Sequence, residues 1–230
     1  MKRLLTVFMI LLLTAVVGVA SATPVEELTN LAQYAPEDAP AFITVRTDDA
    51  YFETLDDVLN RVVDATGEAQ GIDLNIRELI PQIVQGVLPL PLPGDFDTAI
   101  RPWLGDNMAF TVLSTSAVLN DPNNAVVVML DVADFEAAQA FLEDYYGDVL
   151  GEGVILVEQE DGTLFYETQN TTEPSVVLRE DVMFVGLNNA LATFLTEEPD
   201  NLSLAASEEF TTIIDAMPND EYNIFAYFNS

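Results

Sequence analysis

The chain has 230 residues, with 39 Asp and Glu against 7 Lys and Arg, no His and no Cys, giving a formal net charge of −32. The lack of Cys excludes disulfides, thiolate nucleophiles and Cys-ligated metal sites, and the lack of His removes the commonest general base. We expect no binding to nucleic acid or to an anionic membrane surface, because both depend on clustered Lys and Arg. Half of the residues are hydrophobic, which indicates a folded core rather than a disordered acidic tail.

Residues 1–22 have the pattern of a secretory signal peptide. Lys2 and Arg3 precede an apolar run from Leu4 to Val19, and Ala20-Ser21-Ala22 places small residues at a cleavage site after Ala22. An uncleaved membrane anchor is the alternative. The pattern predicts export to the cell envelope or the extracellular space, outside the cytoplasmic membrane.

The mature chain that this cleavage would leave carries 39 acids against five Arg (7 − 2) and no Lys. Chemistry that needs a Lys nucleophile or Schiff base is therefore excluded in residues 23–230. The scatter of the cations along the sequence predicts local ion pairs rather than one anion site; they are Arg46, Arg61, Arg77, Arg101 and Arg179.

The predicted elements follow from the spacing of apolar residues and from turn signals. Residues 23–35 are interpreted as a leader with a short helical piece around Val25–Tyr34. In chain order we then expect a strand at Ala41–Arg46, a helix at Tyr51–Ala65 capped by Asp48-Asp49, a Pro-broken apolar segment at Ile72–Leu92, a short helix at Asp95–Ile100 and a strand at Asn107–Ser114.

The second half predicts more strands than helices. A nearly continuous apolar strand at Ala125–Val132 indicates a central position in a sheet. The remaining expected elements are a helix at Phe135–Tyr146 capped by Asp134, strands at Gly153–Gln159 and Thr163–Gln169 joined by the hairpin turn Glu160-Asp161-Gly162, strands at Ser175–Leu178 and Val182–Val185, helices at Asn188–Leu195 and within Ser203–Met217, and a strand at Tyr222–Phe228.

This order lacks regular strand–helix–strand alternation, so we predict an α+β fold: a curved, mainly antiparallel sheet with helices packed on one face. The domain is expected to span residues 36–220. Residues 221–230 are either its last strand or the first strand of a second repeat in a longer protein, because Met217–Phe228 echoes the Pro-x-Asp turn and apolar strand of Ala35–Val45.

Four segments together resemble a family of exported bacterial proteins classed only as a domain of unknown function, common in Chloroflexi-like and actinobacterial genomes. They are Pro36–Ile43, the Pro-Trp-Leu-Gly-Asp segment Pro102–Asp106, Val126–Val132 with the following Asp134–Leu142, and Ser203–Ala205 with Glu208–Phe210 and Met217-Pro218. The resemblance implies a fold and a compartment but no mechanism. Its members are usually longer, and the Pro89–Pro93 insert departs from their pattern.

The apolar, Pro-broken segment is the best candidate for a binding surface, because it is long and need not form a regular core helix. It could form a lid or groove for an apolar ligand, or an interface to a protein, whereas the alternative is a helix and loop that cover the sheet. Trp103 could add a stacking platform, or it could pack at the sheet edge beside a turn at Gly105. The candidate residues are Ile76, Leu79, Ile80, Ile83, Val87, Leu90, Leu92 and Trp103.

Acidic residues near the first helix are weaker candidates for a Ca²⁺ site. Asp48, Asp49, Glu53 and Asp56 lie close in sequence, but they do not match a Ca²⁺-binding loop. We expect no cofactor and no catalytic residue. The function predicted is a non-enzymatic binding or structural domain at the cell envelope, for a protein partner or an apolar ligand. The alternatives are a carboxylate-dependent hydrolase of polysaccharide or peptide and a calcium- or salt-stabilised structural module.

Overall fold

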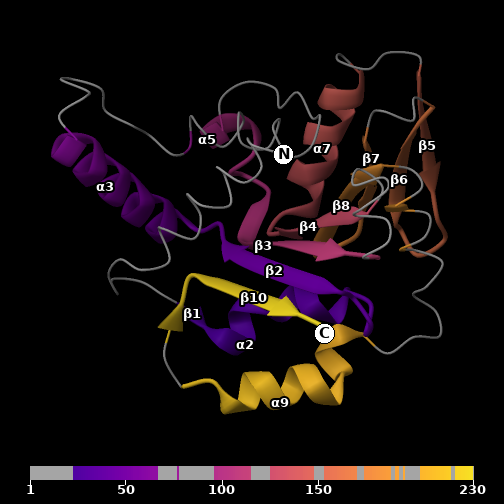
Figure 1. The fold of residues 1–230 in the computed structure, drawn as a ribbon. Helices are drawn as coiled ribbons and strands as arrows, with labels where there is room; N and C mark the ends of the chain where they lie inside the picture. The colour runs from indigo at the N-terminus through magenta and orange to yellow at the C-terminus, as the bar shows by residue number, and fades with distance from the viewer. Residues whose placement is uncertain are drawn as a thin grey trace.

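The computed structural model describes residues 23–66, 77, 96–114, 125–147, 153–169, 174–187, 190–191, 194, 203–218 and 221–229. Eight strands form one open antiparallel sheet in the order β10-β2-β3-β4-β8-β7-β6-β5 (Figure 1). Its strands are β2 Ala41–Arg46, β3 Leu104–Val112, β4 Val126–Val132, β5 Val154–Glu158, β6 Leu164–Thr168, β7 Pro174–Leu178, β8 Val182–Leu187 and β10 Ile224–Phe228, while β1 Thr23–Pro24 and β9 Glu221–Tyr222 pair separately. The predicted α+β class with an antiparallel sheet is confirmed.

The helices pack against both faces of the sheet, not against one as the sequence analysis expected. On one face lie α5 Phe96–Ala99 and α7 Phe135–Tyr145, drawn above the sheet in Figure 1, and the first turns of α3 Asp49–Thr66, which is drawn at the left. On the other lie α2 Val25–Leu28, the 3₁₀ turns η1 Asn30–Gln33 and η5 Leu204–Ala206, and α9 Glu208–Ala216.

The reason for this difference is the composition of the central strands. Successive side chains of a strand point to opposite faces, so a strand without polar alternation needs cover on both. Every residue of β7 and β8 is buried. In β4, Val128 belongs to the apolar cluster under α3, α5 and α7, whereas Val127 and Met129 belong to the cluster under α2 and α9.

Residues 23–35, interpreted above as a leader, contribute to this second apolar cluster. Leu28 and Leu31 are fully or almost fully buried. The Thr44 hydroxyl on β2 donates a hydrogen bond to the Leu28 carbonyl at 2.9 Å, and β1 pairs with β9. The N-terminal segment is therefore a packed layer of the described fold.

Several local predictions are confirmed in detail. The strand at Ala41–Arg46 has the predicted bounds, and the Asp134 carboxylate caps α7 by accepting from the Ala137 amide at 3.0 Å. The β5–β6 hairpin turns at Gly162, whose φ of +85° suits glycine. The helix expected within Ser203–Met217 is divided: Ser207 ends η5 and caps α9 by accepting from the Phe210 amide.

The strand expected at Tyr222–Phe228 is β10 over Ile224–Phe228, and it forms one end of this sheet by pairing with β2. No helix in the described part of the chain is both long and apolar enough to cross a bilayer. The apolar segment Ile72–Leu92 lies outside the described residues except for Arg77, as do residues 1–22 and most of Asn188–Leu195.

Candidate functional site

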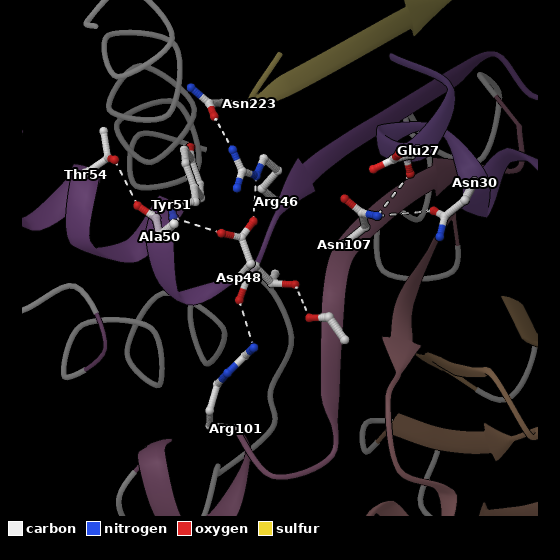
Figure 2. Close-up of polar contacts among 12 residues, drawn as sticks. Glu27, Asn30, Arg46, Asp48, Ala50, Tyr51, Thr54, Arg101, Asn107 and Asn223 are labelled. Carbon is white, nitrogen blue, oxygen red and sulfur yellow. Dashed lines mark hydrogen bonds and ion pairs between the residues drawn. The ribbon is translucent and has the colours of Figure 1, made fainter. Parts of the chain in front are cut away.

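Three of the five arginines that follow residue 22 gather where β2, α3 and α5 meet. Arg46 is 5% exposed, forms an ion pair with Asp48, and donates to Asn223 Oδ1 at 3.1 Å. Figure 2 shows this guanidinium between the two partners. Asp48 also accepts from the Tyr51 amide at 3.0 Å, which caps α3. One buried arginine thus ties together β2, the start of α3 and the residue before β10.

Asp49, next in the chain, is held by the other two arginines. Arg77 Nη2 lies 2.8 Å from its carboxylate and Arg101 Nε 3.3 Å from it. Arg101 also donates to the Thr47 carbonyl at 3.0 Å, and Arg77 lies 3.7 Å from Asp97. The predicted local ion pairs are present: those of Arg46, Arg77 and Arg101 lie around Asp48 and Asp49, and Arg61 lies 3.7 Å from Asp57 on α3.

These ion pairs give the Ca²⁺ candidates another role. The carboxylates of Asp48 and Asp49 face guanidinium groups, which already supply the positive charge that a cation would bring. Glu53 is exposed and Asp56 half-buried on α3. Among the described residues, no three acidic side chains are grouped closely enough to share a metal ion.

A second polar cluster joins the N-terminal layer to the sheet. The Asn30 side-chain amide donates to both Asp131 carboxylate oxygens at 3.2 and 3.1 Å, and the Asn107 amide donates to the Glu27 carbonyl at 3.1 Å. Figure 2 shows Asn107 pointing toward Glu27 and Asn30. Burial raises the pKa of Asp131 above its ordinary value of 3.8, with the Asn30 hydrogen bond opposing that rise.

The Pro102–Asp106 segment builds a bulge beside this cluster. Leu104 pairs with Val132 and Met108 pairs with Leu130, so β3 advances four residues between these pairs while β4 advances two. The extra residues of β3 form the bulge. Gly105 in the bulge approaches Asp131 so closely that a Cβ there would lie 2.5 Å from the Asp131 Cβ. The Thr47 hydroxyl donates to the Gly105 carbonyl at 2.7 Å. The segment thus connects the two polar clusters.

Trp103, one of the candidate residues, is buried rather than exposed at the surface. It is 3% exposed, its indole N–H donates to the Ala99 carbonyl at 2.9 Å, and its ring packs 5.2 Å from the Phe141 ring. The expectation that Trp103 packs at the sheet is the one that the structure supports. The other apolar candidates lie outside the described residues; they are Ile76, Leu79, Ile80, Ile83, Val87, Leu90 and Leu92.

Strand β5, at the sheet edge, holds three of the five exposed large apolar side chains in the described part of the chain, and it was not among the sequence-based candidates. Ile155, Leu156 and Val157 are 44%, 51% and 42% exposed, and of the described strands only β6 pairs with β5. Figure 1 places β5 at the end of the sheet opposite β10. A signal for it was present: Val-Ile-Leu-Val lacks the polar alternation expected of an edge strand.

Comparison with known proteins identifies the family and no activity. The family model described as "Protein of unknown function (DUF3352)" matches residues 4–230, so the chain belongs to this family. No curated protein matches. A solved structure titled "Structure of crystal form III of TP0453" is similar with 8% sequence identity and a TM-score of 0.41, and the match covers 90% of this chain and 64% of that chain. The chain thus spans less than two thirds of the length of that relative.

Proposed function

We propose that this member of the DUF3352 family is an exported, non-enzymatic domain that binds a protein partner at the cell envelope through the sheet edge at β5. One observation carries the proposal: three consecutive apolar side chains are exposed on a strand that pairs on one side only among the described strands. Exposed edges are ordinarily shortened, charged or covered, because they pair readily with other chains. An extended segment that adds a strand to such an edge is a common mode of protein recognition.

The polar clusters support binding over catalysis. The carboxylates of Asp48 and Asp49 are committed to arginines and to a helix cap, so they are not poised as an acid–base pair. His and Cys do not occur in the chain, and Lys does not occur after residue 22. Export is supported by the pattern of residues 1–22.

Amide hydrogen exchange tests the proposal. Residues 23–230 are mixed with the concentrated exported protein fraction of the source cells, and exchange is followed at single-residue resolution. We expect added protection at Val154–Glu158, with little change in β10 at the other edge as the internal control. Unchanged exchange in β5 in the presence of that fraction would overturn the proposal. A fusion of residues 1–22 to a reporter that is active only outside the cytoplasm tests export separately.

A further inference from the structure

Of the described strands only β6 pairs with β5, so the backbone groups of β5 that point away from β6 have no strand partner in the described part of the chain. Gln169 N donates to the Gly153 carbonyl at 2.9 Å, and Gln159 N donates to the Thr163 carbonyl at 2.9 Å. Backbone groups alternate in direction along a strand, so the odd-numbered residues from 153 to 159 bond to β6. The N–H and C=O groups of Val154, Leu156 and Glu158 therefore point away from β6. They form a template for one added strand about five residues long.

The side chains of β5 indicate what that strand would carry. Leu156 lies opposite Tyr166 and shares its face, whereas Val157 lies opposite Phe165 on the other face. Both faces of the edge are therefore apolar. An added strand contacts its neighbour with alternate side chains on the two faces. A partner that fits must have apolar residues at successive positions rather than at every second one.

The charged residues of β5, β6 and the hairpin between them are all acidic, although backbone hydrogen bonding and then the charge of Arg179, outside these residues, lower the pKa of Asp161 in the hairpin. Residues 153–169 include Glu158, Glu160, Asp161 and Glu167 and no basic residue. Glu158, Glu160 and Asp161 are exposed, and the side chain of Glu158 lies at the end of the exposed apolar run. Opposite charges directly across a pair of strands stabilise the pairing, and like charges weaken it. A partner strand with Lys or Arg at its ends complements this edge.

The same charges disfavour a second copy of this chain. Two copies paired through β5 would each bring the acidic β5–β6 hairpin, and each would carry a net charge of −34 after cleavage (5 − 39). Net charge far from zero opposes self-association. Self-pairing also places acids opposite acids, because residues 153–169 of each copy carry four acids and no basic residue.

We propose that β5 takes up an extended protein segment with successive apolar residues flanked by Lys or Arg, as a ninth strand of the sheet. This inference rests on the proposed function and names the chemical class of its partner. The acids recruit the basic flanks and fix the register, and the apolar residues of the segment cover Ile155, Leu156 and Val157. Ionic strength weakens the first contribution and not the second.

Synthetic peptides test the inference without knowledge of the natural partner. The probe is N-acetylated, C-amidated Lys-Lys-Val-Ile-Val-Lys-Lys, titrated into residues 23–230 and followed by backbone amide NMR shifts. Matched peptides replace every Lys with Glu, or the central Ile with Pro, which keeps the charge but removes strand pairing. We expect the Lys peptide to shift Val154–Glu158 amides, and the other two to bind roughly tenfold more weakly or not at all.

Two variants, each with a control on α9, localise the contact. Glu158→Lys should weaken the Lys peptide roughly fivefold and strengthen the Glu peptide, whereas Asp215→Lys, which changes the net charge equally, should alter neither by more than about twofold. Leu156→Thr should weaken the Lys peptide by about tenfold, and Ile213→Thr, at an exposed apolar position on α9, should not. Melting curves confirm that each variant is folded.

The peptide experiments test the chemistry of the partner, whereas the exchange experiment with the exported fraction tests whether a partner exists. Equal binding of the Lys, Glu and Pro peptides, or equal effects of Glu158→Lys and Asp215→Lys, overturns the inference. If protection of β5 by the exported fraction persists in that case, the proposed function stands and the partner has another chemistry. A dimer in sedimentation analysis that Leu156→Thr dissociates would also overturn it, in favour of a second copy.

Discussion

The close approach of Gly105 to Asp131 gives the sharpest test of the packing. In Gly105→Ala, the new methyl carbon would lie 2.5 Å from the Asp131 Cβ and 3.1 and 3.2 Å from the Asp131 carbonyl carbon and oxygen. Two of these atoms belong to the backbone of the central strand β4, so neither can rotate away. Relief requires the bulge in β3 and the β4 backbone to separate.

We expect this separation to cost about 2 kcal/mol, the usual cost of overpacking an interior by one carbon. For a chain of this size, the melting temperature would fall by about 4–8 °C. The cost would increase if the shift also broke the 2.7 Å bond from the Thr47 hydroxyl to the Gly105 carbonyl. Urea unfolding followed by circular dichroism measures the free energy of unfolding directly.

Gly147→Ala is the matched control, because nothing lies within 4 Å of the position that its Cβ would take. It should leave stability unchanged or raise it by up to about 1 kcal/mol, through reduced freedom of the unfolded chain. If Gly105→Ala unfolds at the same urea concentration and with the same slope as Gly147→Ala, the close approach is not a feature of the folded protein.

Three further outcomes follow from the polar clusters and the charge. Asp48→Ala removes both the α3 cap and the carboxylate partner of buried Arg46, so it should lower the free energy of unfolding by about 3 kcal/mol. Asp134→Ala removes a helix cap alone and should lower it by about 1 kcal/mol. Urea unfolding measures both variants. Burial raises the pKa of Asp131 in the folded state, so the folded chain binds this proton more tightly than the unfolded chain does. The free energy of unfolding of the unmodified chain, minus that of Asp131→Asn, should therefore fall as pH rises from 3.8 through the raised folded pKa and stay level at higher pH. Urea unfolding midpoints of both proteins across this pH range measure the difference. Raising NaCl from about 10 mM to about 500 mM should raise the melting temperature by several degrees because it screens the net charge, and CaCl₂ at equal ionic strength should give no further saturable rise.

Much of the fold could be predicted because its signals are local. The alternation in Ala41–Arg46, the Asp134 cap before an amphipathic run, and the Glu160-Asp161-Gly162 turn each lie within a few residues, and all three appear in the structure. The sheet order could not be predicted in this way. Pairing of β10 with β2 joins residues about 180 positions apart, and no short pattern encodes it.

The two-sided cover of the sheet was missed for a related reason. Residues 25–35 are short helical turns near Pro24 and Pro36, which on their own predict a leader. Their burial depends on the apolar second face of β4, β7 and β8, and that face is apparent only once the strands are assembled. The arginine network is likewise tertiary, since Arg46, Arg77 and Arg101 are scattered in sequence and meet only at Asp48 and Asp49.

Strand β5 differs from the other strands of the sheet in how its sequence relates to its exposure. Strands β7 and β8 have continuous apolar sequences and are buried throughout, with sheet neighbours on both sides and helices or turns over their faces. Strand β5 has the same kind of sequence, Val-Ile-Leu-Val, but its side chains from Ile155 onward are exposed. At the other edge, β10 buries Phe225 and Tyr227 and exposes Ala226 and Phe228, which is the alternation of an ordinary edge strand. A strand with an interior composition at an exposed edge costs solubility, unless a further strand completes the sheet.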